Sequence, residues 1–207
     1  MDFDFDDIAE RADNLRSARK VEPQPQPQPQ QNIAWIDTET SGLDERDGSM
    51  LLEVACIVTD SELNELGTFH EVVYHNEASV ARLKRWARPV VVEMHEKTGL
   101  WDRLTDGTFL HNIDSDLLSF LEQFGGIGTM PIAGNSVAFD ARFMREYLPN
   151  AFGHLDYRMI DVSTLRLLKD RWFPETPKLE KHSDHTALKD IQESIRELKH
   201  YREVMFR

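Results

Sequence analysis

The chain has 207 residues, of which 40% are hydrophobic and 29% are charged. This composition predicts one folded domain with a substantial core and room for an appendage. The formal net charge of −13 argues against tight binding to a long nucleic-acid duplex, which usually needs a basic surface. The single cysteine, Cys56, excludes an intramolecular disulfide. With no apolar membrane span and an acidic N-terminus that lacks a signal-peptide core, we expect a cytoplasmic protein.

Residues 1–31 differ from the rest of the chain. Residues 23–30 alternate proline with glutamine, a pattern typical of an extended spacer. Before this spacer, apolar residues recur at helical spacing, which fits either a frayed tail or a short docking helix on a tether. We therefore predict an acidic, disordered tail over residues 1–31 and one folded domain over residues 32–207.

The first half of that domain is rich in strand signals. Residues 33–36, Ile-Ala-Trp-Ile, predict a buried central strand. Residues 51–59 and 69–74 are two further apolar runs, and residues 60–64 between them have the composition of a hairpin turn. Three consecutive strands with short connections predict an antiparallel meander.

The second half alternates between helix and strand patterns. The expected elements are a helix around residues 117–124, a strand at 131–134, a helix at 139–147, a strand at 159–162, a helix at 165–172 and a last helix at 188–198. Strands followed by alternating helices and strands indicate the α/β class, with a mixed five-stranded sheet flanked by helices.

Carboxylates follow the first predicted strand. Asp37 and Glu39 are two residues apart, so both side chains leave the same face if the strand continues through them. Two adjacent carboxylates repel each other unless a cation bridges them. The pair therefore indicates a metal site, although a simple surface charge at a strand end is the alternative.

Two later segments carry further polar groups that suit such a site. Asp140 follows the turn Gly-Asn-Ser and should lie in the first turn of a helix, where it could alternatively serve only the helix dipole. His185 and Asp190 would point about 140° apart on one regular helix. They can converge only if His185 lies on the loop before the helix. A histidine placed there is a suitable general base, and a surface histidine is the alternative.

These segments resemble the motifs of the DEDDh 3′–5′ exonucleases, which have a ribonuclease H-like fold. Asp37-Thr38-Glu39 is similar to the first motif of the family, Asp140 to the second, and His185 with Asp190 to the third. Within the family, the chain is most similar to the oligoribonucleases over roughly residues 32–205. The supporting stretches are 35–37, 41–44, 52–55 with 58–60, 134–136, 157–158 with 161–165, and 185–187 with 190–194.

The resemblance implies a function and a set of site residues. Asp37, Glu39, Asp140 and Asp190 would bind two Mg²⁺ or Mn²⁺ ions, and His185 would act as the general base. The substrate would be short single-stranded RNA, degraded from the 3′ end to nucleoside 5′-monophosphates. The residues implied in substrate binding are Leu43, Trp86, His95 and Tyr157. The family also implies a homodimer, in which Tyr157 approaches the active site of the partner subunit.

Several residues depart from the oligoribonuclease pattern. Thr38, Thr40 and Ser41 are more similar to the first motif of DNA-proofreading exonucleases, and Lys189 replaces an acidic residue. The loop over residues 80–98 is longer than usual. A 3′–5′ exonuclease on single-stranded DNA is therefore the alternative enzyme. A domain that only binds nucleotide ends or a protein partner is the alternative without catalysis.

Overall fold

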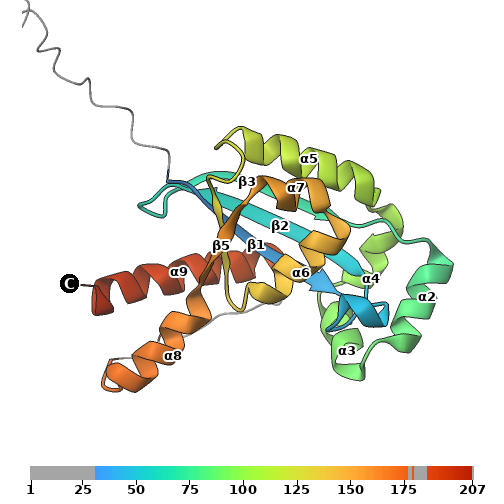
Figure 1. Cartoon of the computed structure of the whole chain (residues 1–207). Helices are drawn as coiled ribbons and strands as arrows, with labels where there is room; N and C mark the ends of the chain where they lie inside the picture. Colours follow the sequence, from blue (N-terminus) through green and yellow to red (C-terminus); the bar gives the residue numbers. More distant parts are fainter. Residues whose placement is uncertain (1–30, 177–178, 180–185, 207) are drawn as a thin grey trace, which may run out of the picture.

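A computed structural model of the chain describes residues 31–176, 179 and 186–206. At its centre is a five-stranded sheet with the strand order β3-β2-β1-β4-β5 (Figure 1). The strands are β1 Ile33–Thr40, β2 Leu51–Thr59, β3 Glu65–Val72, β4 Pro131–Gly134 and β5 Asp156–Asp161. The middle strand, β1, is antiparallel to β2 and parallel to β4. The predicted α/β class and mixed five-stranded sheet are thus confirmed.

The first three strands form the predicted antiparallel meander. Asp60 closes the turn between β2 and β3, because its side chain accepts hydrogen bonds from the backbone N–H groups of Glu62 and Asn64. The third strand begins earlier than residue 69, because residues from Glu65 onward pair with residues 53–59 of β2. All nine residues of β2 are buried, since both of its faces are covered.

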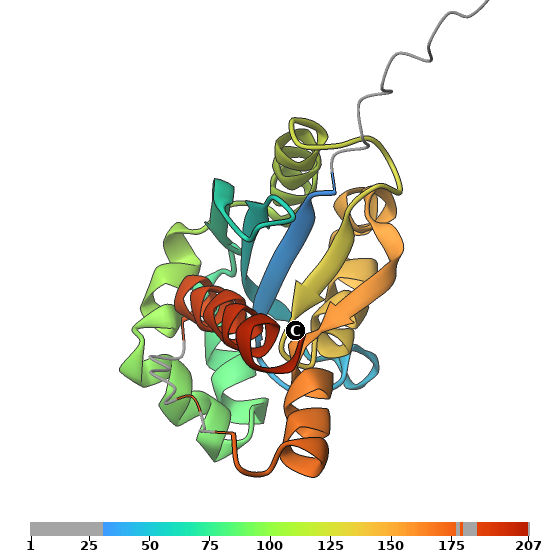
Figure 2. The same cartoon turned by 90° about the vertical axis from the view of Figure 1, so that its left-hand side faces the viewer.

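Helices cover both faces of the sheet (Figure 2). On one face, α5 (Leu110–Glu122), α6 (Ala138–Tyr147) and α7 (Pro149–His154) pack against the side chains of Ala34 and Ile36. On the other face, α8 (Val162–Trp172) and α9 (Ala187–Met205) pack against Trp35. Successive residues of a strand point to opposite faces, so β1 contributes side chains to the hydrophobic core on each face of the sheet.

A group of short helices, which the sequence patterns did not predict, follows β3. These are α2 (Glu77–Trp86), α3 (Pro89–Lys97), α4 (Leu100–Arg103) and the short 3₁₀ turn η2 (Leu104–Asp106). They enclose a third small core with Leu52 of β2, built on Leu83, Leu100, Trp101 and Leu104. The expected long loop over residues 80–98 is therefore helical. As described below, this helical group contacts the end of β1.

None of the helices in the described part of the chain is long and apolar enough to cross a membrane. The predicted boundary near residue 31 falls just before β1. Asn32 lies at that point and donates a hydrogen bond from Nδ2 to the backbone carbonyl of Phe124 at 2.7 Å. The tail over residues 1–30 lies outside the described residues, so its predicted disorder stays a prediction.

Candidate active site

Strand β1 carries the first two carboxylates. It continues through Thr40, so Asp37 and Glu39 leave the sheet on the same face, which is the face covered by α9. The strand is central in the sheet, and at Asp37 and Glu39 its pairing with Ala55 and Glu53 of β2 fixes the spacing of the two side chains. Glu39 is only 8% exposed.

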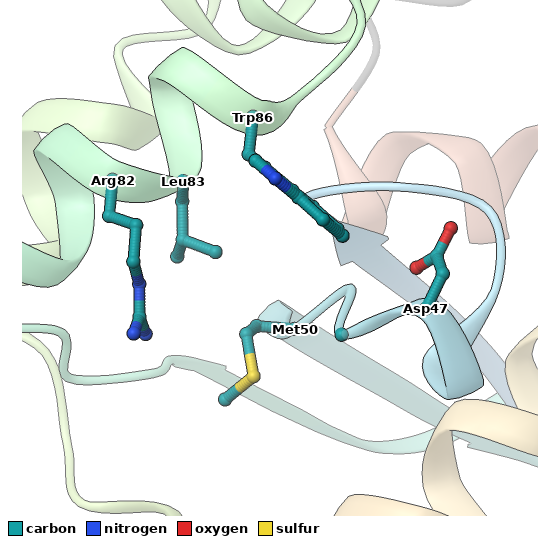
Figure 3. A pocket seen from close by; sticks show the side chains of 6 residues that line it. Asp47, Met50, Arg82, Leu83 and Trp86 are labelled. Carbon is teal, nitrogen blue, oxygen red and sulfur yellow. The ribbon is translucent and has the colours of Figure 1, made fainter.

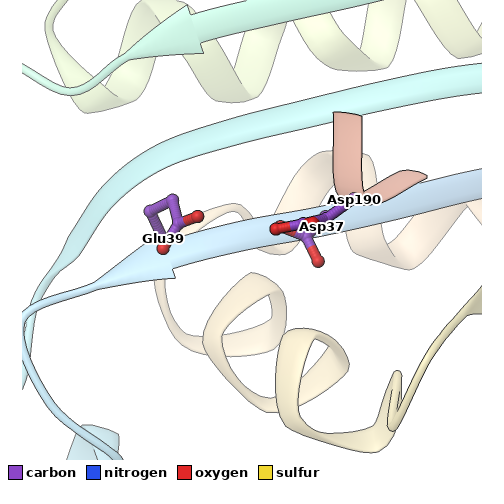
Figure 4. A group of neighbouring side chains, drawn as sticks. All are labelled: Asp37, Glu39 and Asp190. Carbon is purple, nitrogen blue, oxygen red and sulfur yellow. The ribbon is translucent and has the colours of Figure 1, made fainter. Parts of the chain in front are cut away.

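Helix α9 brings Asp190 to the same place. Its apolar stripe, which includes Ala187, Ile191 and Ile195, packs against the sheet, and Asp190 lies in the first turn. One oxygen atom from each of Asp37, Glu39 and Asp190 lies within 4.8 Å of the others (Figure 4). The structure therefore brings together carboxylates that are about 150 residues apart in sequence. We call these three residues the carboxylate cluster.

Asp140 lies beside this cluster and is held by Thr38. As predicted, it occupies the first turn of α6. Its Oδ1 accepts hydrogen bonds from the backbone N–H of Thr38 at 2.8 Å and from the Thr38 hydroxyl at 2.7 Å. Thr38 alternates with Asp37 and Glu39 along the strand, so Asp140 approaches β1 from the side of α6. In the sequence Thr38 stands out only as a departure from the oligoribonuclease pattern, and no local signal predicts its contact with Asp140.

A tight connection between β4 and α6 sets the position of Asp140. Ser136 has a left-handed backbone (φ 56°), and its N–H donates to Asp161 Oδ1 and Ser163 Oγ. Gly134 lies so close to β1 that an added Cβ would be 3.0 Å from the carbonyl oxygen of Ile36. The short turn and this close packing direct the start of α6 toward the end of β1.

The carboxylates share a buried environment that disfavours their charged forms. Burial, and second the charge of Asp140, raise the pKa of Asp37 well above its usual value. Burial, and second the charge of Glu53, raise the pKa of Glu39 to about 8. Burial also raises the pKa of Asp140 to about 7, although the hydrogen bonds from Thr38 act against it. Such a site favours either protons or cations.

The residues present suit divalent metal ions. The carboxylate cluster offers oxygen atoms only, which Mg²⁺ and Mn²⁺ prefer over nitrogen or sulfur. A cation would also relieve the repulsion among the buried acids that raises their pKa values. The chemistry of the donor set therefore fits the predicted metal site.

The predicted substrate-binding residues occupy different environments. Leu43 is 57% exposed on the turn after β1, where Arg142 donates a hydrogen bond to its carbonyl oxygen. Trp86 is 67% exposed and lines a pocket of about 370 Å³ with Met50 and Arg82 (Figure 3). Tyr157 is 82% exposed on the edge strand β5, away from the carboxylate cluster of its own chain.

His95 differs from these residues because it is fully buried. Its Nε2–H donates to the backbone carbonyl of Thr40 at 2.9 Å, and its Nδ1 lies 3.9 Å from Glu39 Oε2. Burial lowers the pKa of His95, so the neutral ring is favoured. In this conformation the imidazole supports the end of β1 and offers no surface to a substrate. The predicted base, His185, lies outside the described residues.

The chain belongs to the exonuclease family, whose sequence profile matches residues 34–198. Together with the fold and the carboxylate cluster, this membership defines a 3′–5′ exonuclease, a phosphodiester hydrolase. This conclusion argues against the alternative hypothesis of a domain that only binds nucleotide ends or a protein partner.

Within this family, the chain is similar in sequence to curated oligoribonucleases. The oligoribonuclease of Pseudomonas putida is 39% identical over 84% of this chain and 95% of its own length. That of Nocardia farcinica is 40% identical over 84% of this chain and 81% of its own length. That of Vibrio vulnificus is 40% identical, with coverage of 86% and 97%. The predicted family is confirmed.

Solved structures of exonuclease I share the fold. A zinc-bound complex of the Escherichia coli enzyme with single-stranded DNA has a TM-score of 0.67, 18% identity and coverage of 86% of this chain. The enzyme from Methylocaldum szegediense has a TM-score of 0.64, 20% identity and coverage of 85%. This chain matches 42% and 41% of those two chains. At such identities the likeness concerns the fold alone.

Proposed function

We propose that this protein is a metal-dependent 3′–5′ exoribonuclease that degrades short oligoribonucleotides to nucleoside 5′-monophosphates. The observation that carries the proposal is the carboxylate cluster, which β1 and α9 assemble from opposite ends of a chain of the exonuclease family. The names of the curated relatives support RNA as the substrate. The net charge of −13 also favours a short substrate with few phosphate contacts.

Asp37, Glu39 and Asp190 would hold the metal ions, and Asp140 would complete the ligand set from the α6 side. When bound, a pair of divalent ions lowers the pKa of an attacking water and stabilises the leaving oxygen. The role of the chain is to fix the ligands in place. The hydrogen bonds from Thr38 keep the Asp140 carboxylate beside β1 before any ion arrives.

His185 would accept the proton of the attacking water. Support for this role comes from the position of α9, whose N-cap residue is Thr186 and whose first turn carries Asp190. His185 directly precedes Thr186, so the chain enters the helix next to the carboxylate cluster. A histidine pKa near neutrality suits proton transfer at physiological pH.

Leu43 and Trp86 would contact the bases. Both are large, exposed apolar side chains. Leu43 lies on the turn directly after β1, and Trp86 is the last residue of α2. Trp86 lies over the loop after β1, because a Cβ added to Gly48 would be 3.9 Å from its ring. Stacking of a base on an aromatic ring does not depend on the identity of the base, which suits an enzyme that degrades short RNA of any sequence.

The alternative substrate is single-stranded DNA, which remains open because residues 37–40 resemble the first motif of DNA-proofreading exonucleases. Thr38, which distinguishes this chain from the oligoribonuclease pattern, donates its hydroxyl to Asp140 inside the site. Initial rates on an RNA dinucleotide, an RNA 20-mer and the matching DNA molecules separate the two functions. We expect the RNA dinucleotide to be cleaved fastest, and a clear preference for the DNA 20-mer would overturn the proposal.

We also propose a homodimer through the β5–α8 edge. Tyr157, Met159, Leu167 and Trp172 expose apolar surface there, and β5 has an unpaired edge within the described part of the sheet. Exposed apolar surface on an edge strand favours association with a second copy. Light scattering on the wild type and on Tyr157→Lys tests this, with a dimer expected for the wild type and weaker association for the variant.

A further inference from the structure

Glu53 is a buried carboxylate that the metal site does not include. It lies on β2 directly opposite Glu39 in the antiparallel pairing of β1 with β2. Directly opposed residues share a face and have Cβ atoms about 5 Å apart, so both carboxylates face the side of the sheet that carries the cluster. Glu53 is only 2% exposed. Two like charges in this arrangement would destabilise the sheet without compensation.

The cationic side chain of Arg103 and the imidazole of His70 provide that compensation. Arg103, the last residue of α4, donates from a guanidinium nitrogen to Glu53 Oε2 at 3.2 Å. His70 of β3 contacts the other oxygen, Oε1, through Nε2. Because both oxygens already have partners, Glu53 is held in place and is not itself arranged as a metal ligand. Arginine keeps its charge at every relevant pH, so the pairing with Arg103 is permanent.

The negative charge of Glu53 reaches the cluster. Among the charged neighbours of Glu39, Glu53 raises the pKa of the Glu39 carboxyl more than Asp190 or Asp140 does. Arg103 acts in the opposite direction on the same carboxyl. A field that disfavours a second negative charge at Glu39 equally favours a cation there.

We propose that Glu53 is a positioning residue whose fixed negative charge strengthens divalent-cation binding at Asp37, Glu39 and Asp190. Arg103 and His70 hold this charge behind Glu39, and Arg103 partly offsets it. The inference rests on the proposed metal-dependent function. It gives a reason for the buried pair of glutamates in the middle of the sheet.

A purely structural role for the same contacts predicts a different pattern. If the Arg103–Glu53 pair only joined α4 to β2, loss of either partner would loosen the same junction, and both variants would change metal binding in the same direction. If charge is the cause, the two variants have opposite effects on metal affinity. Removing Glu53 takes away attraction for a cation, whereas removing Arg103 takes away repulsion.

The test is a calorimetric titration of metal-free protein with Mn²⁺, together with a melting curve for each variant. Even at the dielectric constant of water, a unit charge ~7 Å from a divalent ion changes its binding by about tenfold. We therefore expect Glu53→Gln to bind Mn²⁺ about tenfold more weakly and Arg103→Gln to bind it more tightly. Both variants should melt at a lower temperature, because each leaves a partner unpaired.

Glu65→Gln serves as the matched control. It removes the same charge from the exposed start of β3, where the strand pairs with Thr59 at the far end of β2. This variant should bind Mn²⁺ as the wild type does. Unchanged affinity in a folded Glu53→Gln protein would overturn the inference. If Glu53→Gln does not fold, the Mn²⁺ affinity of Arg103→Gln tests the inference alone. Weaker or unchanged Mn²⁺ binding by Arg103→Gln would contradict a charge effect. A wild type that binds no Mn²⁺ would instead refute the proposed function itself.

Discussion

Without metal, the protein should become less stable as the pH rises from 5 to 8. The reason is Glu39, whose pKa burial and the charge of Glu53 raise from 4.5 to about 8. The folded state therefore keeps a proton that the unfolded state releases. This contribution to stability is fully present below pH 4.5 and is lost as the pH rises through about 8. Most buried carboxylates with cationic partners show the reverse dependence.

The effect should be large on the scale of protein stability. One pKa unit corresponds to about 1.36 kcal/mol, so the shift of Glu39 alone corresponds to a loss of up to ~5 kcal/mol. Asp140, with its pKa raised to about 7, acts in the same direction. A typical domain has only about 5–15 kcal/mol of unfolding free energy. Divalent ions should reverse the loss, because they replace the protons among the ionised carboxylates.

Urea unfolding followed by circular dichroism measures this dependence. The wild type in EDTA is compared at pH 5, 6.5 and 8, and then at pH 8 with excess Mn²⁺. Glu39→Gln, which has no proton to lose at this position, should show a smaller slope with pH, whereas Glu65→Gln should retain the slope of the wild type. A free energy of unfolding that stays constant or rises from pH 5 to 8 in EDTA would refute the assignment of buried, protonated acids.

Three further predictions concern catalysis and domain organisation. Asp140→Asn should keep the two hydrogen bonds from Thr38 and should melt at no lower a temperature than the wild type in EDTA, but turnover should fall to background; full activity would exclude a ligand role. His185→Ala should reduce kcat by about 10²–10⁴-fold, the usual effect of losing a general base, and calorimetry should show nearly normal Mn²⁺ binding. Loss of Mn²⁺ binding would make His185 a ligand instead. Deletion of residues 1–31 should leave the melting temperature and the rate on dinucleotides unchanged, and unfolding or inactivity would place the domain boundary earlier.

The parts of the fold that the sequence predicted are those with a strong local pattern. The apolar run before Asp37, the Gly-Asn-Ser turn before Asp140 and the apolar stripe around Asp190 each define an element without reference to the rest of the chain. The helices between Glu77 and Arg103 have only 10, 9 and 4 residues, and Pro89 begins the second of them, so none has an apolar stripe as long as that of α9. Their core forms only when they meet Leu52 of β2.

The same distinction applies to the active site. The three segments that we propose to bind metal could be recognised because each matches a motif of the family, and the resemblance implied that they meet. The residues that support them have no local signal. Arg103 is 50 residues from Glu53, and His95 is 55 residues from Thr40. Only the packing of the α3–α4 segment against the end of β1 and the start of β2 brings these pairs together.

Substitutions of His95 test whether such a buried residue supports the end of β1 or contacts the substrate. Its side chain is fully buried, its Nε2–H donates to the carbonyl of Thr40, and its ring packs edge-on against Trp101 at 5.5 Å. His95→Ala would leave the Thr40 carbonyl unpaired and open a cavity beside Glu39. An unsatisfied buried carbonyl costs about 1–3 kcal/mol, so the melting temperature should fall by several degrees.

Substitution by glutamine tells positioning apart from substrate contact. His95→Gln retains an N–H donor of similar reach, so it should recover much of the stability and of the Mn²⁺ affinity that His95→Ala loses. The family resemblance instead implies that His95 touches the substrate. In that case both variants should raise the KM for an RNA dinucleotide, and neither the melting temperature nor Mn²⁺ binding should change. Because the imidazole is enclosed by α3, α4 and the end of β1, we expect the first pattern.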